Sequence, residues 1–274
     1  MKLGISTYTL TWSFGVRGFE RPVRPLTPVD LIRIASEHGL SLVQIADNVP
    51  LHESSTREIH KLMLAALETN ITIEIGTRGT TPAHLLRYLE IARQLDSPLV
   101  RTLITQPDLI LAEQEIREIL PLYERANVIL AIENHGLQTA PTLKSLLDRI
   151  DSPMLACCLD TVNSYGSLEG PAEVTELLLP FTVNLHLKDY EIVRLDHQMG
   201  YEIRGTPAGS GRLNIPLLVE QLQQKGRPST AILEQWTPYT GSIEDAIAKE
   251  RIWMQESLTY LKRLNVFNMK EGTK

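Results

Sequence analysis

Four residues that can bind a metal or move a proton each close a short apolar run in this chain. They are Glu133, Asp160, His186 and Glu234, and the runs before them read VILAI, MLACCL, TVNL and AIL. Buried parallel strands have near-continuous apolar sequences, and a charged group at the end of one is costly unless it is solvated, paired or metal-bound. We therefore expect the four side chains to form one site rather than separate salt bridges around a rim.

Three carboxylates and one imidazole make a hard, mostly oxygen ligand set that suits Mn²⁺, Mg²⁺ or Co²⁺ and also accepts Zn²⁺. Without a cation, closely spaced carboxylates would repel one another. A divalent ion could hold a hydroxy-carbonyl compound by both oxygens and stabilise the enediolate formed when a base removes the proton between them. Glu133 and Glu234 would then be the acid/base pair, which suits isomerisation or epimerisation.

The elements that must position these residues alternate along the whole chain. Apolar runs predict strands near 2–8, 41–47, 71–77, 98–104, 128–134, 154–160, 182–189 and 229–235. Amphipathic patterns predict helices near 27–39, 56–70, 82–95, 111–127, 142–150, 171–180, 214–225 and 244–264. Eight βα units predict an α/β fold, a (β/α)8 TIM barrel in one domain spanning 1–274. A doubly wound open sheet would call for a glycine-rich loop after the first strand, and STYTL is not one.

Composition narrows the function classes. The chain has 274 residues and a formal charge of −6, which argues against a nucleic-acid partner. Cys157 and Cys158 are neighbours that should point to opposite faces of a strand, so we expect two buried, reduced thiols. No apolar stretch reaches the length of a transmembrane helix, and the start lacks the apolar core of a signal peptide. A cytoplasmic protein without a membrane partner is the expectation.

Two long connections follow strands and should therefore lie at the C-terminal face of a barrel. The first, roughly 9–26, carries Trp12, and the second, roughly 190–213, ends in GTPAGSG. Such loops suggest a pocket wall and a lid. The backbone amides of Gly209-Ser210-Gly211 could also contact a phosphate, although the motif equally fits a simple turn.

With its site motifs in view, the chain resembles the xylose isomerase-like TIM-barrel family of sugar phosphate isomerases and epimerases. The matching pieces are IENH at 132–135, LDTVN at 159–163, HLKD at 186–189, the GSG turn at 209–211 leading to Ile215-Pro216, and LE at 233–234. They cover the second half of the chain. The first half agrees only in its alternation of strands and helices.

The resemblance implies one divalent metal, often Mn²⁺, on Glu133, Asp160, His186 and Glu234. In the ketose epimerases of this family, the two matching glutamates are also the acid/base pair. The family includes hydroxypyruvate isomerases, dehydratases and decarboxylases of oxidised sugar acids, so the substrate does not carry over. Those epimerases have a substrate-binding histidine where this chain has Asn163, which argues against a free ketohexose.

Further residues are candidates for substrate binding. His135 and Lys188 lie two residues beyond Glu133 and His186 and share their faces. Lys188, Arg204 or Arg101 could hold a carboxylate or phosphate, although Lys188 and Arg101 equally suit buried ion pairs. Asp47 could bind a hydroxyl or cap a turn, and Trp12 could pack on a sugar face. Asp189 points away in a regular strand and should cap the following loop.

The sequence thus predicts a metal-dependent isomerase or epimerase of a small carbohydrate, acting through an enediolate. The alternative keeps the metal but makes the enzyme a lyase, either a decarboxylase of a 3-oxo sugar acid or a dehydratase. A metal-dependent endonuclease of the same family would need further histidine and aspartate ligands, and His38, His52, His60 and His84 fall on helices or loops. A non-catalytic sugar-binding barrel is a third alternative, and a homodimer or homotetramer is left open.

Overall fold

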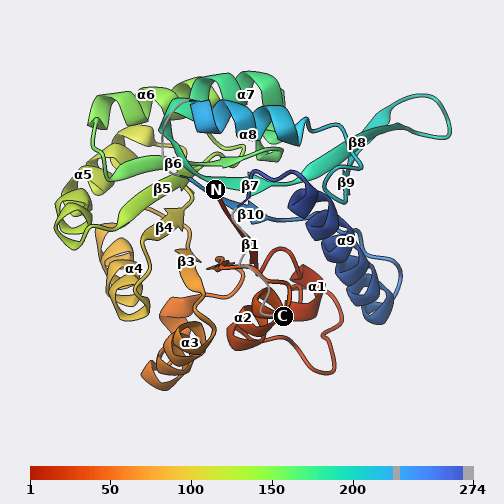
Figure 1. Ribbon diagram of the computed structural model, residues 1–274. Coiled ribbons are helices and arrows are strands. Elements are labelled where there is room, and N and C mark those ends of the chain that lie inside the picture. The colour runs from red at the N-terminus through yellow and green to blue at the C-terminus, as the bar shows by residue number, and fades with distance from the viewer. Residues whose placement is uncertain (225–228, 268–274) are drawn as a thin grey trace.

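A closed barrel of eight parallel strands forms the centre of the protein, as a computed structural model shows (Figure 1). The structure describes residues 1–224 and 229–267. The strands are β1 (Lys2–Ser6), β2 (Leu42–Ile45), β3 (Thr72–Gly76), β4 (Leu99–Thr102), β5 (Ile129–Glu133), β6 (Leu155–Asp160), β7 (Thr182–Leu187) and β10 (Thr230–Leu233). They follow one another around the barrel in chain order, and β10 closes it against β1 with Lys2 paired to Thr230. The predicted TIM barrel is confirmed.

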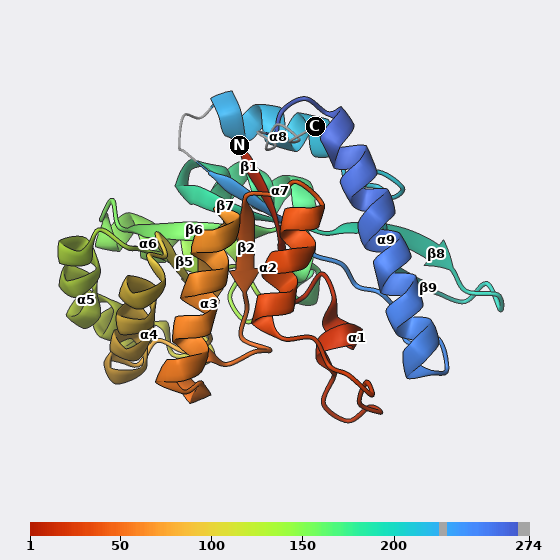
Figure 2. The same cartoon turned by 60° about the horizontal axis from the view of Figure 1, so that its bottom comes forward.

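Helices surround the barrel and cover its outer face (Figures 1 and 2). They are α1 (Thr11–Phe14), α2 (Pro28–Glu37), α3 (Thr56–Thr69), α4 (Pro82–Leu95), α5 (Leu109–Ala126), α6 (Ala140–Ile150), α7 (Pro171–Leu178), α8 (Ile215–Gln224) and α9 (Ile243–Arg263). Short 3₁₀ segments lie at Leu51–Glu53, Asn163–Ser167 and Leu179–Phe181. None of the described helices is both long and apolar enough to cross a membrane.

Local chemistry explains where several helices begin. The Thr27 and Ser55 side chains cap α2 and α3 in reciprocal capping boxes with Asp30 and Glu58. α5 starts two residues before its predicted position because Asp108 accepts hydrogen bonds from the first-turn amides. α9 coincides with the predicted last helix, whereas the predicted end of the preceding helix near 225 lies outside the described residues.

Alternation along each strand separates two environments. Side chains facing outward, such as Ile132, Cys157 and Leu185, pack under the helices in the main apolar core. Inward-facing ones, such as Ala131 and Cys158, form a small second cluster at the barrel centre. Polar side chains such as Gln44, Glu74 and Asn184 also face the interior, where they are hydrogen-bonded to one another.

The connection at 190–213 differs from the expected loop. It contains an antiparallel hairpin, β8 (Asp189–Arg194) and β9 (Tyr201–Thr206), which extends away from the barrel in both views (Figures 1 and 2). Alternating apolar and polar residues on each side of the QMG turn allow this pairing. The other long connection contains the short helix α1, which contacts α9.

Candidate active site

The four strand-end residues meet at one point inside the barrel mouth. Glu133 and Asp160 are the last residues of β5 and β6, His186 lies in β7, and Glu234 directly follows β10. The His186 Nδ1 atom lies 3.7 Å from Glu133 Oε2, 3.7 Å from Asp160 Oδ2 and 3.6 Å from Glu234 Oε2. Strand pairing produces this convergence, since Asp160 is in register with His186 and β10 flanks β7 on its other side.

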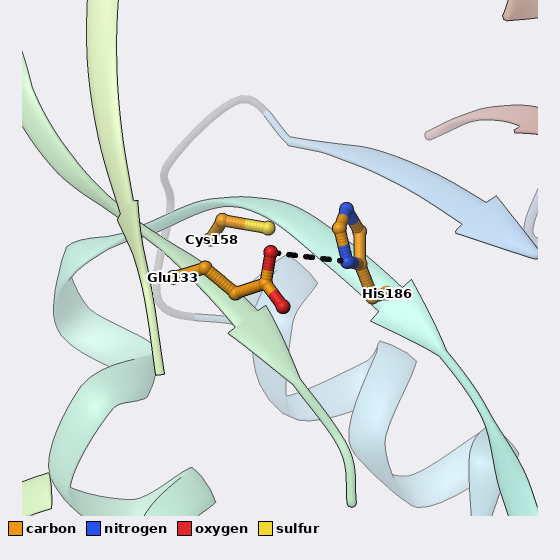
Figure 3. Close-up of side chains that lie close together, drawn as sticks. All are labelled: Glu133, Cys158 and His186. Carbon is orange, nitrogen blue, oxygen red and sulfur yellow. Dashed lines mark ion pairs between the residues drawn. The ribbon is translucent and has the colours of Figure 1, made fainter. Parts of the chain in front are cut away.

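The thiol of Cys158 lies beside this cluster, next to Glu133 and His186 (Figure 3). Its Sγ atom donates to Asn184 Oδ1 at 3.0 Å. Burial, with the negative charge of Glu133 adding to it, raises the pKa of this thiol. Both cysteines are free and buried, and Cys157 packs in the outer core, as the alternation of the strand predicted.

The arrangement fits a divalent cation. Among the described residues, His186 Nδ1 is a buried atom without a hydrogen-bond partner, and it faces the three carboxylates of the cluster. Asp160, His186 and Glu234 each offer a donor atom within 4.8 Å of the others. Glu133, Asp160 and Glu234 bring three carboxylates to the cluster, and a divalent ion between them would offset their mutual repulsion. These residues therefore suit a divalent metal ion.

Lys188 forms buried ion pairs with two of these carboxylates. Its Nζ atom lies 2.6 Å from Asp160 Oδ2 and 2.9 Å from Glu234 Oε2. Burial disfavours the ammonium, but the neighbouring carboxylates outweigh it and raise the pKa of Lys188. Burial likewise acts against ionisation of Asp160, and the Lys188 ammonium outweighs it and holds the pKa of Asp160 well below its usual range.

Glu234 is also held in its ionised form. Burial alone would raise its pKa, but His186 and Lys188 together lower it. A sequence-distant hydroxyl, Ser6 Oγ, donates to Glu234 Oε1 at 2.9 Å.

Arg101 fixes the opposite side of the cluster from inside the barrel wall. Its guanidinium lies 2.8 Å from Asp47 Oδ1 and 2.9 Å from Glu133 Oε2, and the side chain is fully buried. A Cβ at Gly76 would come within 3.2 Å of this guanidinium, so the glycine makes room for it. Of the two alternatives raised for Arg101, the structure contains the buried salt bridge. Asn163 completes the contacts of Glu133 by donating from Nδ2 to Oε1 at 2.7 Å.

A pocket of about 400 Å³ opens over the cluster. Eight of the predicted site residues line it: Trp12, Asp47, Arg101, Glu133, His135, Asn163, Lys188 and Glu234. Tyr8, Thr11, Val16 and Trp236 lie in the same wall. The indole of Trp12 is held in place because its Nε1 atom donates to the Thr237 carbonyl at 2.8 Å. The first long connection therefore supplies part of the pocket wall, as expected.

Arg204 does not belong to this pocket. It lies on β9 in the projecting hairpin, where its exposed guanidinium pairs with Glu202. The prediction failed because the connection folds into a hairpin that leads its side chains away from the barrel mouth. No residue of 190–213 is part of the described pocket lining.

The suggested phosphate loop is also occupied internally. The amides of Gly209, Gly211 and Leu213 donate to the Asp189 carboxylate at 2.9, 3.0 and 3.0 Å. Asp189 therefore caps this loop, as predicted, and these amides are already satisfied by a carboxylate of the chain itself. The GSG motif builds a turn rather than an anion site.

Sequence reasoning missed three residues of the site: Ser6, Tyr8 and Gln44. Tyr8 lies in the pocket wall with its hydroxyl 3.4 Å from Asp47 Oδ2. Gln44 Oε1 lies 2.8 Å from Nε2 of His186. Gln44 is a single polar residue within an apolar strand, and Ser6 is the polar last residue of β1; these positions were the available indication.

Comparison with known proteins finds a matching family and a relative that aligns along nearly the whole chain. The family model described as xylose isomerase-like TIM barrel matches residues 13–263. The 3-oxo-isoapionate decarboxylase of Pectobacterium atrosepticum is 33% identical over 271 residues, covering 97% of each chain.

Solved structures show the same fold at low identity. D-psicose 3-epimerase from Clostridium cellulolyticum, crystallised with D-tagatose, superposes with a TM-score of 0.71 at 16% identity, covering 97% of this chain and 98% of that one. A xylose isomerase-like TIM barrel protein from Mycobacterium smegmatis, in complex with magnesium, gives 0.69 at 14% identity, covering 95% and 97%. The family match and the full-length relative agree with the site built from the strand ends: the chain belongs to the xylose isomerase-like TIM barrel family.

Proposed function

We propose that this protein is a divalent-metal-dependent decarboxylase of a 3-oxo sugar acid. The observation that carries the proposal is Lys188, a buried ammonium that lines the pocket beside Asp160 and Glu234. The relative that matches along nearly the whole chain is named a 3-oxo-isoapionate decarboxylase, which supports the same reaction class. Of the alternatives drawn from the sequence, the lyase is therefore favoured over the isomerase or epimerase.

Glu133, Asp160, His186 and Glu234 would hold the cation. When bound, it would supply positive charge that polarises the ketone next to the scissile carbon–carbon bond. It would also neutralise the carboxylates that now engage Lys188, leaving the ammonium to pair with the substrate carboxylate. Lys188 would thus place the carboxyl group that is lost.

The chemical step breaks the bond between the carboxylate carbon and its neighbour. Carbon dioxide leaves, and the bonding electron pair forms an enolate, which is an enediolate if the neighbouring carbon carries a hydroxyl. That carbon then takes up one proton and gives a ketone one carbon shorter. The Lys188 ammonium lines the pocket and would donate this proton to the carbon. Solvent would then reprotonate Lys188.

An epimerase would need one of its two glutamates to carry a proton in the resting enzyme. Glu234 is unsuited to this because His186 and Lys188 lower its pKa. Glu133 accepts a hydrogen bond from Asn163 and pairs with Arg101. Decarboxylation needs one proton delivered to carbon and no protonated glutamate, so it fits the lowered pKa of Glu234 better.

The rest of the pocket suits a small polyhydroxy compound. Trp12, Val16 and Trp236 offer an apolar wall, and Tyr8 and His135 offer hydrogen-bonding groups. The pocket volume of about 400 Å³ is compatible with one sugar acid.

The test follows 3-oxo-isoapionate with Mn²⁺-loaded protein in D₂O. We expect carbon dioxide release and one deuterium on the carbon that lost the carboxylate. Lys188→Met should lose this release while still binding Mn²⁺, and Lys144→Met is the control because Lys144 forms an exposed pair with Asp148.

Deuterium uptake with an unchanged carbon count would instead establish the isomerase or epimerase. Glu133→Gln and Glu234→Gln would each remove a carboxylate that holds the cation, so either change should abolish turnover. Full activity in both variants would reject their assignment to the reaction.

A further inference from the structure

The metal-facing imidazole is tied to the barrel interior through its other nitrogen. His186 Nδ1 faces the three carboxylates, while Nε2 lies 2.8 Å from Gln44 Oε1. Figure 3 shows the nitrogen directed at Glu133 and the second one on the far side of the ring. An amide oxygen can only accept, so this contact requires the ring to carry a proton on Nε2.

The orientation of the Gln44 amide is fixed in turn. Its Nε2 atom donates to Glu74 Oε2 at 3.2 Å and to Asn184 Oδ1 at 3.1 Å. Turning the amide over would place its oxygen against these two acceptors. The side chains of Gln44, Glu74 and Asn184 are all buried, so no bulk water would compensate.

Hydrogen bonds also fix the orientation of the Asn184 amide. Its Nδ2 atom donates to Glu74 Oε2 at 2.9 Å and to Thr230 Oγ1 at 2.8 Å, and its Oδ1 accepts from the Cys158 thiol at 3.0 Å. The Thr230 hydroxyl in turn donates a hydrogen bond to Glu74 Oε1 at 2.7 Å. Gln44, Asn184 and Thr230 therefore all donate to one buried carboxyl group, that of Glu74.

We propose that Gln44, oriented by Glu74, is a positioning residue that holds His186 with its proton on Nε2 and its Nδ1 lone pair directed at the cation. The inference rests on the metal dependence in the proposed function. It goes beyond it by assigning a role to a layer of polar residues that touches neither substrate nor metal.

Without Gln44, the neutral His186 ring would be expected to carry its proton on Nδ1 instead of Nε2. Three carboxylate oxygens lie 3.6–3.7 Å from Nδ1 and would attract a proton there. A proton on Nδ1 would abolish the lone pair that a metal needs. Partners that orient a ligating histidine are typically worth about 10–100-fold in metal affinity, so a similar loss is expected without Gln44.

The first test is nitrogen NMR on the metal-free protein labelled with ¹⁵N-histidine, at a pH where the His186 ring is neutral. His186→Gln identifies the resonances. We expect the neutral wild-type ring to carry its proton on Nε2, and the Gln44→Leu ring to carry it on Nδ1. A wild-type ring protonated on Nδ1 would overturn the proposal.

The second test is Mn²⁺ titration followed by electron paramagnetic resonance. Gln44→Leu and Glu74→Gln should each weaken binding about 10–100-fold. Glu74→Gln is the sharper variant, because Gln44 stays in place while a new amide donor disturbs its orientation. Tyr123→Phe is the control: it removes a buried hydrogen bond to the Leu85 carbonyl, outside the barrel interior, and should leave Mn²⁺ affinity unchanged.

Unchanged Mn²⁺ affinity in folded Glu74→Gln would overturn the role of Glu74, and unchanged affinity in both variants would overturn the whole inference. These outcomes are separable from the proposed function. If tautomer and affinity behave as expected but 3-oxo-isoapionate releases no carbon dioxide, only the proposed reaction fails.

Discussion

Glu250 should make the stability of this protein depend on pH. This residue of α9 is fully buried, and its carboxylate accepts hydrogen bonds from the backbone amides of Trp12 at 2.8 Å and Ser13 at 2.7 Å. Burial raises the pKa of Glu250 to about 7, against the opposing effect of these hydrogen bonds. The contact links α9 to the segment that carries the Trp12 wall of the pocket.

The raised pKa of Glu250 determines the sign and size of this pH dependence. The folded chain binds this proton more tightly than the unfolded chain, whose carboxyl keeps its ordinary pKa of 4.5. The extra stability is fully present below pH 4.5 and is lost as the pH rises toward about 7. At about 1.4 kcal/mol for each tenfold change in proton affinity, the total is about 3 kcal/mol.

The perturbation is Glu250→Gln, which resembles the protonated side chain at every pH. We expect the stability of the wild type relative to this variant to fall by about 3 kcal/mol between pH 4 and pH 8. The assay is urea unfolding followed by circular dichroism across that range, with chelator present so that metal binding does not contribute. Glu68→Gln, which removes an exposed carboxylate from α3, is the control.

Parallel stability curves for the wild type and Glu250→Gln would refute the reasoning. They would mean that the two backbone donors fully offset the cost of burying the charge. The other titrating groups are common to both proteins, so their contributions cancel in the difference.

Three further outcomes are expected. Chelation should abolish turnover and added Mn²⁺ or Mg²⁺ should restore it; undiminished activity in the chelated protein would exclude metal dependence. Lys188→Met should destabilise the metal-free protein by about 3–5 kcal/mol because it leaves buried carboxylates unpaired, whereas Lys144→Met should change unfolding in urea by less than about 1 kcal/mol. Asp189→Asn should cost about 1–3 kcal/mol in the same measurement, since one acceptor oxygen is lost under the amides of Gly209, Gly211 and Leu213; a wild-type midpoint would contradict that role.

The projecting hairpin marks one limit of prediction from sequence. The long connections, 190–213 among them, suggested a pocket wall and a lid, and Arg204 was a candidate to hold a substrate carboxylate or phosphate. Cross-strand pairing, for example of Glu191 with Arg204, instead forms a hairpin, which extends away from the barrel (Figures 1 and 2). Alternation of side chains does not reveal the direction in which a hairpin leaves a barrel, because that direction depends on how the chain packs at its base.

Glu74 and Gln44 mark a second limit. Both are polar residues in apolar strands, and neither was singled out beforehand. Period-two alternation shows that Thr72, Glu74 and Gly76 share a face, but only closure of the barrel makes that face its interior. The partners of Glu74 come from β2, β7 and β10, which are up to 156 residues away in the chain.

The sequence by itself determined the alternation of strands and helices, and with it the barrel and the convergence of Glu133, Asp160, His186 and Glu234 at one rim. It could do so because parallel strands bring their carboxyl ends to the same face. The tertiary structure alone decided which atoms pair there: Lys188 with Asp160 and Glu234, Arg101 with Glu133, and Gln44 with His186. Such pairings depend on where strands far apart in the chain place their side chains in space, and local sequence patterns carry no information about that.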